Sequence, residues 1–345
     1  MRSSGIHISG FPLTLNPPAP CLSWDALDVK WKRGDVQLLA MYEELALELE
    51  NYDIFYNWNG INIHPEFVQQ LPTLNIFGCA DDPESSELLS KPVAWAYDLS
   101  LINNIAEVNS YHHWGVHNVY YRPLGFFASE FDPTLTKDDI LMKERKNDIT
   151  MMCERDSGWR KERLDKFSKE FPKGGYYGRG WPNGFLPYER KVPLYQNTKI
   201  GINMHNSTGP VNFRTFELPA NGVMQICDNK SDLGKIFELN KEAVGFDTIE
   251  EAIELTHYYL DHDDERRKIA AAGWERACKD YNEVAVFNII HKYANELYPE
   301  FTLKEKDPIV FLKKHRKKTT HLRTCDYLLN SCLIKIKSFK KMTKL

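Results

Sequence analysis

Along the first third of the chain, short apolar runs alternate with segments in which apolar residues recur every three or four positions. The second pattern, seen from Val36 to Leu49, predicts a helix with one buried face, whereas the short runs predict strands. Strands are expected at Gly5 to Ser9, Tyr52 to Trp58, Leu74 to Cys79, Val93 to Tyr97 and Val116 to Tyr121, and further helices at Pro65 to Gln70 and Leu101 to Trp114. This alternation predicts a doubly wound parallel sheet.

The alternation starts again at Asp148, which indicates a second domain of the same kind. A turn at Ser207 to Pro210 precedes a short helix, and Pro219 followed by Asn221-Gly222 predicts the end of that helix. The other elements expected here are strands at Ile149 to Cys153, Tyr176 to Tyr177, Ile200 to Met204 and Val223 to Cys227, and a helix at Arg160 to Phe171. No tandem repeat is visible.

The predicted fold class is α/β, with two Rossmann-like domains. At 345 residues, the chain exceeds the size that a single core usually serves. We expect an N-terminal domain at 1–122, a linker at 123–147, a second domain at 148–303 and a basic tail at 304–345.

Composition is that of a globular protein, at 42% hydrophobic and 12% aromatic residues. No apolar tract is long enough to span a bilayer, and the segment MRSSGIHISGF lacks the apolar core of a signal peptide. The seven cysteines form no C-x-x-C pair, which argues against a disulfide framework or a zinc site. We therefore expect a cytoplasmic protein.

Charge is distributed unevenly. Residues 304–345 hold 13 Lys or Arg against 3 acidic residues, a net +10, so residues 1–303 hold 31 against 45, a net −14. The tail mixes these basic residues with Leu, Ile and Phe, and such a segment can lie on an anionic membrane surface, at the inner face of the plasma membrane. A partly disordered, solvated tail or a nucleic-acid or protein partner would fit the same charges. Because the body is acidic, nucleic acid is not the expected partner.

The candidate chemistry is concentrated from Lys199 to Asp228. We expect Asn212 and Arg214 in the first turn of the short helix, where unpaired backbone N–H groups and a guanidinium can both bind an anion such as a diphosphate. Glu217 follows three residues later and could hold the vicinal diol of a ribose. We expect its carboxylate to face the surface. The same spacing would also fit an ordinary surface ion pair between Arg214 and Glu217.

From roughly Asp148 to Tyr281 the chain resembles the C-terminal half of CgeB-type glycosyltransferases, relatives of the group 1 glycosyltransferases with the GT-B fold. The matching residues are Ile200-Gly201-Ile202-Asn203, Arg214-Thr215-Phe216-Glu217 with Ala220-Asn221-Gly222, and Tyr258-Tyr259-Leu260 through Glu265-Arg266 to Ala272-Gly273. The resemblance implies two Rossmann-like domains that face each other across a cleft. It also implies that Glu217 holds the donor ribose and that Arg214 and the Gly209 turn face the diphosphate. Many group 1 enzymes carry an acidic residue eight positions earlier, where this chain has Gly209.

Two further sets of residues belong to the donor side if this resemblance holds. Arg160 follows the first strand of the second domain and would meet the donor phosphates, unless it only begins a solvent-facing helix. Gly178 and Gly180 follow the next strand, where resembling proteins read the nucleobase through the backbone. Trp181 beside them would stack on the base or simply belong to the core.

On the acceptor side, Asp81 and Asp82 follow a predicted strand, and Asp-Asp-Pro resembles a motif at this place in CgeB-type proteins. Either carboxylate could act as a base or orient an acceptor hydroxyl, and either could instead cap the helix that Pro83 begins. His113, after His112 near a helix end, would face the sugar or be structural. No third ligand stands at metal spacing, so we expect no metal.

The predicted function is transfer of a sugar from a UDP-, GDP- or ADP-linked donor to a glycan or lipid-linked acceptor in bacterial surface polysaccharide synthesis. No cofactor is expected, and the resemblance favours retention of configuration. Two alternatives remain open: a nucleotide-sugar epimerase or hydrolase on the same fold, and a non-catalytic module that binds through the basic tail.

Overall fold

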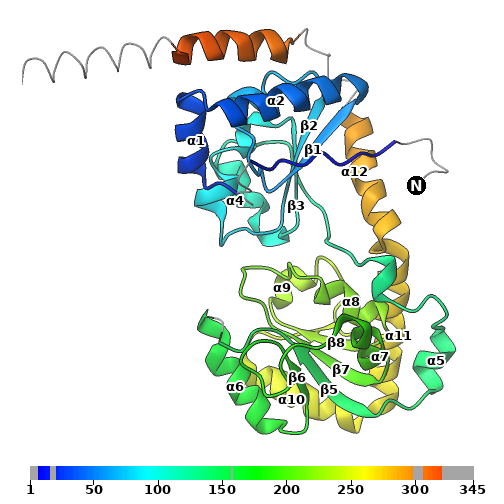
Figure 1. Cartoon of the computed structure of the whole chain (residues 1–345). Helices are drawn as coiled ribbons and strands as arrows, with labels where there is room; N and C mark the ends of the chain where they lie inside the picture. Colours follow the sequence, from blue (N-terminus) through cyan, green and yellow to red (C-terminus); the bar gives the residue numbers. More distant parts are fainter. Residues whose placement is uncertain (1–6, 16–20, 157, 298–305, 321–345) are drawn as a thin grey trace, which may run out of the picture.

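The computed structural model describes residues 7–15, 21–156, 158–297 and 306–320, which form two α/β domains (Figure 1). The N-terminal domain contains β1 (Ile54–Trp58), β2 (Leu74–Cys79), β3 (Leu99–Ile102) and β4 (Val119–Tyr121), with α1 (Trp24–Lys32), α2 (Val36–Glu48), α3 (Pro65–Val68) and α4 (Val108–His113). The C-terminal domain contains β5 (Asn147–Met152), β6 (Gly175–Tyr177), β7 (Thr198–Asn203), β8 (Met224–Cys227) and β9 (Val244–Gly245), with α5 (Lys137–Met142), α6 (Lys161–Glu170), α7 (Lys191–Gln196), α8 (Arg214–Ala220), α9 (Lys230–Leu233), α10 (Ile249–Asp261) and α11 (Asp263–Asp280). The helix α12 (Glu283–Leu297) follows.

The N-terminal sheet is parallel, with its strands in the order β1-β2-β3-β4. Every residue of β2 is buried, because helices cover both faces of the sheet. The core on one face includes Leu38, Tyr42 and Phe67 from α2 and α3. In the described residues this order runs in sequence without a reversal, so the doubly wound arrangement expected for this half is not what the sheet adopts.

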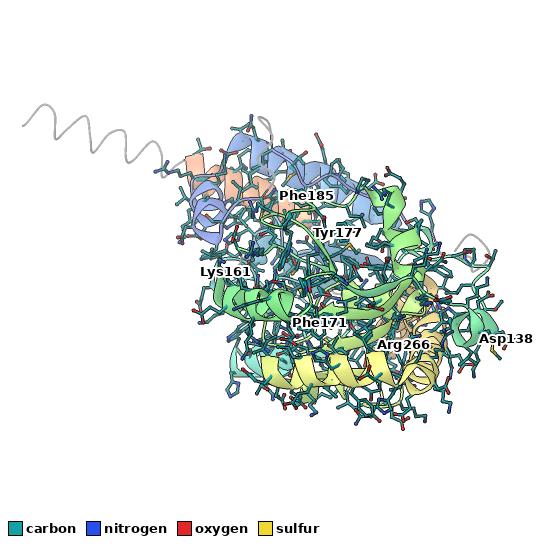
Figure 2. The ribbon with its side chains drawn as sticks, turned by 90° about the horizontal axis from the view of Figure 1, so that it is seen from below. Asp138, Lys161, Phe171, Tyr177, Phe185 and Arg266 are labelled. Carbon is teal, nitrogen blue, oxygen red and sulfur yellow. The ribbon has the colours of Figure 1, made fainter. Side chains whose placement is uncertain are left out.

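The C-terminal sheet is also parallel, and its order is β6-β5-β7-β8-β9. This is a doubly wound order, with the switch point between β5 and β7, where the chain leaves the two neighbouring strands in opposite directions. Figure 2 shows the molecule from below, with Asp138 labelled on the outlying helix α5. Open sheets of this order bind ligands beyond the carboxyl ends of their strands.

After α11 the chain returns to the N-terminal domain, and α12 covers the second face of its sheet (Figure 1). Ile290, Tyr293 and Ala294 pack there against strands β2 and β3. The Tyr293 ring also stacks on Tyr120, with centroids 4.2 Å apart. Residues 283–297, expected in the second domain, therefore complete the core of the first, because the apolar stripe of α12 covers the apolar face of that sheet.

Most expected elements are confirmed within a few residues, and one pair is wrong. The segment expected as a strand at Val93 to Tyr97 contains a 3₁₀ turn at Ala94–Ala96, and the strand is Leu99–Ile102, where a helix was expected to begin. A fully buried strand shows no alternation, so a short apolar run does not distinguish it from a buried helix. Of the strand expected at Gly5 to Ser9, residues 1–6 lie outside the described part and residues 7–9 are irregular. No helix in the described residues is long and apolar enough to cross a membrane.

Replacing Gly201 with Ala tests how closely α8 packs on β7. The added methyl carbon would lie 2.5 Å from Leu218 Cδ2, and Leu218 is itself 2% exposed. We expect the free energy of unfolding in urea to fall by about 1 to 3 kcal/mol, because the core must shift to admit the methyl group. Gly10→Ala is the control, since nothing lies within 4 Å of that position. Equal stability of the two variants would contradict the close packing.

Candidate functional site

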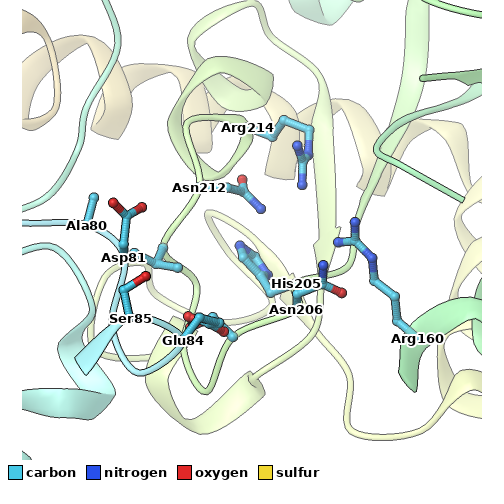
Figure 3. Close-up of a pocket in the computed structure, with 11 residues that line it drawn as sticks. Ala80, Asp81, Glu84, Ser85, Arg160, His205, Asn206, Asn212 and Arg214 are labelled. Atoms are coloured by element: carbon cyan, nitrogen blue, oxygen red, sulfur yellow. The ribbon is translucent and has the colours of Figure 1, made fainter. Parts of the chain in front are cut away.

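A cavity of about 320 Å³ lies between the two domains, beyond the carboxyl ends of β2 and β7. Figure 3 shows its side chains: those from the N-terminal domain gather on one side, and the basic ones from the C-terminal domain lie opposite. The lining residues are Ala80, Asp81, Glu84 and Ser85 from the N-terminal domain and Arg160, His205, Asn206, Ser207, Val211, Asn212 and Arg214 from the C-terminal domain. The cavity therefore has one acidic wall and one basic wall.

Arg160 contributes to the basic wall from the start of α6. Its side chain is 6% exposed, and its Nη1 and Nη2 atoms donate to the backbone carbonyls of Met204, at 2.7 Å, and Glu154, at 3.3 Å. Its Nε has no hydrogen-bond partner in the described structure. Burial lowers the pKa of Arg160 below its ordinary value, and the neighbouring Arg214 adds to this effect. A guanidinium held in this way is a fixed donor for an anion.

Arg214, the first residue of α8, is held by Asn203 at the end of β7. The Asn203 side-chain oxygen accepts from Arg214 Nε at 3.2 Å and from Asn212 Nδ2 at 2.9 Å, and Asn203 is fully buried. Its amide nitrogen lies 3.1 Å from Thr215 Oγ1 and 3.2 Å from Gln225 Oε1. In Figure 3 the guanidinium groups of Arg214 and Arg160 point toward each other. Asn203 thus sets the direction of Arg214, because a bond at Nε leaves the terminal nitrogens to face the cavity.

Asn212 lies just before α8 rather than inside its first turn. Its side-chain oxygen accepts from the Thr215 backbone N–H at 3.1 Å, as a helix-capping side chain does. The residue expected to bind the anion therefore also fixes the start of the helix that carries Arg214.

His205 lines the cavity and is bound to Asp228, the residue after β8. The Asp228 carboxylate accepts from the His205 backbone N–H at 2.9 Å and from its ring Nδ1 at 2.6 Å. Because a carboxylate only accepts, the hydrogen is on Nδ1, and Nε2 lies 3.3 Å from Thr215 Oγ1. Sequence reasoning missed both residues, although each lies within two residues of the end of a strand in a doubly wound sheet, where ligands bind.

The ligand atoms of His205, Cys227 and Asp228 lie within 4.8 Å of one another, close enough to consider a metal. The 2.6 Å separation of His205 Nδ1 and Asp228 Oδ1 is that of a hydrogen bond and leaves no space for an ion between them. Burial raises the pKa of Cys227 well above its ordinary value, so its sulfur remains a neutral thiol. The residues fit a hydrogen-bonded cluster rather than a metal centre.

The acidic wall consists of Asp81 and Glu84. Asp81 is exposed, and its carboxylate accepts a hydrogen bond from Asn59 Nδ2. Glu84 accepts from Ser207 Oγ at 3.3 Å, across the domain boundary. Glu84 was not anticipated from the sequence, because one exposed glutamate after a turn carries no signal of its own.

Asp82 has a structural position and does not line the cavity. It is 2% exposed, and its carboxylate accepts from three hydroxyls: Ser86 at 2.9 Å, Ser90 at 2.7 Å and Tyr111 at 2.6 Å. Of the two adjacent aspartates, Asp82 is therefore the one that organises the turn, and Asp81 is the one free to meet a ligand.

His113 is on the surface of α4, and its Nδ1 is 2.7 Å from the Asn109 carbonyl of the same helix. It does not line the cavity. The structure does not bring His113 together with the other candidate residues.

Glu217 is buried at 2% exposure, which corrects the expectation of a surface-facing carboxylate. It also does not pair with Arg214. Its Oε1 accepts from Lys191 Nζ at 2.7 Å, and the same ammonium group lies 3.0 Å from Glu130 in the linker. Burial raises the pKa of Glu217 to about 7, and the nearby Glu130 carboxylate adds to the rise. Lys191 thus pairs with two carboxylates, and this group of three residues lies beside the cavity without lining it.

Close neighbouring atoms or a positive φ explain the three candidate glycines. A Cβ on Gly178 would lie 2.4 Å from the Cys153 carbonyl, and Gly178 and Gly180 have φ of 125° and 83°, which favour glycine. A Cβ on Gly209 would lie 2.2 Å from the Asn104 side-chain oxygen in the other domain. Gly209 therefore permits contact between domains, and it is not part of the cavity lining. Trp181 is 7% exposed, and its Nε1 donates to the Cys153 carbonyl at 2.8 Å, so it belongs to the core.

Known proteins resemble this chain in sequence over one segment and in structure over most of its length. Residues 160–290 match the model of a family described as glycosyl transferase-like. HepE from Anabaena in complex with UDP superimposes with a TM-score of 0.55 at 13% identity, covering 75% of this chain and 82% of its own. Sucrose-phosphate synthase from Thermosynechococcus elongatus gives 0.57 at 12% identity, covering 77% and 80%. A glycosyltransferase from Rickettsia africae gives 0.52 at 12% identity, covering 76% and 82%.

At these identities the structural matches show the fold, which is the GT-B arrangement of two facing parallel α/β domains. No curated protein sequence matches the chain at a significant level. The narrower CgeB-type resemblance is not confirmed by these comparisons.

A double-mutant cycle tests whether Asn203 acts through Arg214. We expect Asn203→Ala and Arg214→Ala each to weaken pyrophosphate binding by about 10-fold or more, because each removes or misdirects a charge-assisted hydrogen bond. The double variant should be little worse than Arg214→Ala alone in calorimetry. Arg160→Ala replaces Arg214→Ala in the control cycle, since Arg160 makes no bond to Asn203, and its effect should add to that of Asn203→Ala. If the losses in pyrophosphate affinity were additive in both cycles, Asn203 would not act by positioning Arg214.

The carboxylate pair on Lys191 predicts a pH-dependent stability. Because the pKa of Glu217 is about 7 in the folded protein and lower in the unfolded chain, its stabilising contribution is complete below about pH 4 and is lost as the pH rises through about 7. Relative to Glu217→Gln, the wild type should lose up to about 3 kcal/mol of unfolding free energy between about pH 5 and 8 in urea. Parallel pH profiles for the two proteins would show that Glu217 is ionised throughout.

Proposed function

We propose that this protein is a glycosyltransferase that moves a sugar from a nucleoside-diphosphate sugar to a hydroxyl of a glycan or lipid-linked acceptor. The observation that carries the proposal is the pair of inward-pointing guanidinium groups, Arg160 and Arg214, at the switch point of the C-terminal sheet. The match of residues 160–290 to a glycosyl transferase-like family supports it, as do the structures of the similar protein HepE in complex with UDP, with UDP and glucose, and with UDP-glucose. UDP is therefore the proposed nucleotide.

The chemistry follows from the two walls of the cavity. Transfer breaks the bond between the anomeric carbon and the β-phosphate oxygen, and the electron pair stays on that oxygen. Arg160 and Arg214 stabilise the negative charge that develops there. This positive charge offsets that of the diphosphate, so the proposed reaction uses no metal.

Asp81 lies across the cavity from the arginines, on the wall assigned to the acceptor. We assign to it the orientation of the acceptor hydroxyl, whose oxygen forms the new bond to the anomeric carbon. In the retaining reaction that we propose, the hydroxyl proton passes to the departing phosphate oxygen on the same face of the sugar. The anomeric configuration of the product, read by NMR, tests this choice.

Glu217 and Lys191 are assigned to the ribose end of the donor. Their ion pair lies beside Tyr188, with the Lys191 ammonium 5.9 Å from the Tyr188 ring centroid. A ribose diol would donate a hydrogen bond to one carboxylate oxygen of Glu217. Lys191 would then stay paired with Glu130, because it already contacts both carboxylates. Gly178 and Gly180 stay assigned to the approach of the nucleobase.

Calorimetry with UDP, GDP, ADP, CMP, dTDP and pyrophosphate tests the proposal. We expect UDP to bind best, Arg214→Ala to weaken UDP and pyrophosphate alike by about 10- to 100-fold, and Glu217→Gln to weaken only UDP, because pyrophosphate has no ribose. The exposed Lys279→Ala serves as control. Absence of binding by every nucleotide would refute the proposal and favour a non-catalytic protein. Donor consumption without transfer to any acceptor would instead indicate an epimerase or hydrolase.

A further inference from the structure

A basic helix formed by residues 308–320 is attached to the outer end of the N-terminal domain. In Figure 1 it lies along α2, on the side of that domain away from the C-terminal domain. This segment belongs to the region expected as a basic tail, so part of that tail is a fixed element of the fold.

Several contacts with the N-terminal domain hold this helix in place. Leu312 is fully buried in the N-terminal core, and the His315 ring stacks on Trp31 with centroids 3.8 Å apart. His315 Nε2 donates to the Trp31 carbonyl at 3.0 Å. At the far end, a Cβ on Gly34 would lie 2.1 Å from Thr319 Oγ1, so the absence of a side chain there allows close approach. The helix is therefore positioned by core packing rather than by its charges.

The outward face of the helix is strongly basic. Lys313, Lys314, Lys317 and Lys318 are exposed, and their spacing places them on one side of the helix. None of these four forms an ion pair with the described residues, whereas Arg316 pairs with Glu43 of α2 at 2.9 Å. A cluster of unpaired lysines held on a rigid element is suited to a surface of opposite charge.

The sequence that follows the helix favours a lipid surface over a nucleic acid as its binding partner. The following sequence, residues 321–345, combines six Lys or Arg with apolar residues in the run LLNSCLIKIKSF, and a mixture of this kind suits the interface of an anionic bilayer. Nucleic-acid binding would use the charges but not the apolar residues. Residues 1–303 carry a net −14, so an anionic surface would repel the body and attract only this end of the molecule.

We infer that the basic face of helix 308–320 docks on an anionic membrane surface, with the N-terminal domain next to the lipid and the C-terminal domain away from it. The acidic wall of the cavity belongs to this same N-terminal domain, on the side that faces the C-terminal domain. The docking itself does not depend on the proposed sugar transfer.

Cosedimentation with phosphatidylcholine vesicles, with and without phosphatidylserine, tests this inference on the full chain. The wild type should bind only the phosphatidylserine vesicles, and high salt should release it. K313E/K314E/K317E/K318E should lose about 100-fold or more in vesicle affinity. The matched control K169E/K173E/K241E/K279E makes the same change in net charge on exposed lysines of the C-terminal domain and should bind as the wild type does. Equal losses in both variants, or no binding by the wild type, would overturn the inference.

Two further arms complete the test. A chain ending at Thr320 should keep a salt-sensitive part of its vesicle binding, and complete loss would assign the contact to residues 321–345 instead of the helix. Single-stranded RNA should not compete with the vesicles, and efficient competition would favour a nucleic-acid partner and overturn the inference. UDP binding by the helix variant should equal that of the wild type, which separates failure of the membrane contact from failure of the donor site.

Discussion

The cavity depends on a direct hydrogen-bonded contact between the carboxyl ends of the two sheets. Asn104, two residues after β3, donates through Nδ2 to Ser207 Oγ at 3.0 Å and to Thr208 Oγ1 at 3.1 Å, both beyond β7. Thr208 in turn donates to buried Glu107 at 2.6 Å. Gly209 allows this approach because any side chain there would collide with Asn104. The contact holds the two walls, which come from different domains, face to face across the cavity.

The same loop that makes this contact also carries the basic wall. His205, Asn206 and Ser207 directly precede Thr208, and Asn212 and Arg214 follow within six residues. A change in the separation of the domains would therefore move the anion-binding groups together with the contact. The geometry of the donor side is therefore linked to the N-terminal domain, because one short backbone segment carries both the domain contact and the anion-binding side chains.

Side chains that look alike in the sequence have different tasks in the structure. Asp81 and Asp82 are neighbours, yet one is exposed in the cavity and the other is buried under three hydroxyl donors. Arg214 and Glu217 stand three residues apart, as in a helical ion pair. Arg214 instead donates to Asn203, and Glu217 forms an ion pair with Lys191. In both cases burial determines the role of the side chain, because a buried polar group must form its hydrogen bonds with whichever partner the fold brings to it.

The sequence by itself determined the alternation of strands and helices, the division into two α/β domains and the region that carries the candidate chemistry, since periodicity and turn residues act locally. It also pointed to Arg160, Asn212, Arg214 and Asp81, which all line the cavity. Only the tertiary structure decided the strand order, the return of α12 to the first domain, the burial of Glu217 and the roles of Asn203, His205 and Asp228. These depend on contacts between residues far apart in the chain, and local sequence patterns carry no record of such contacts.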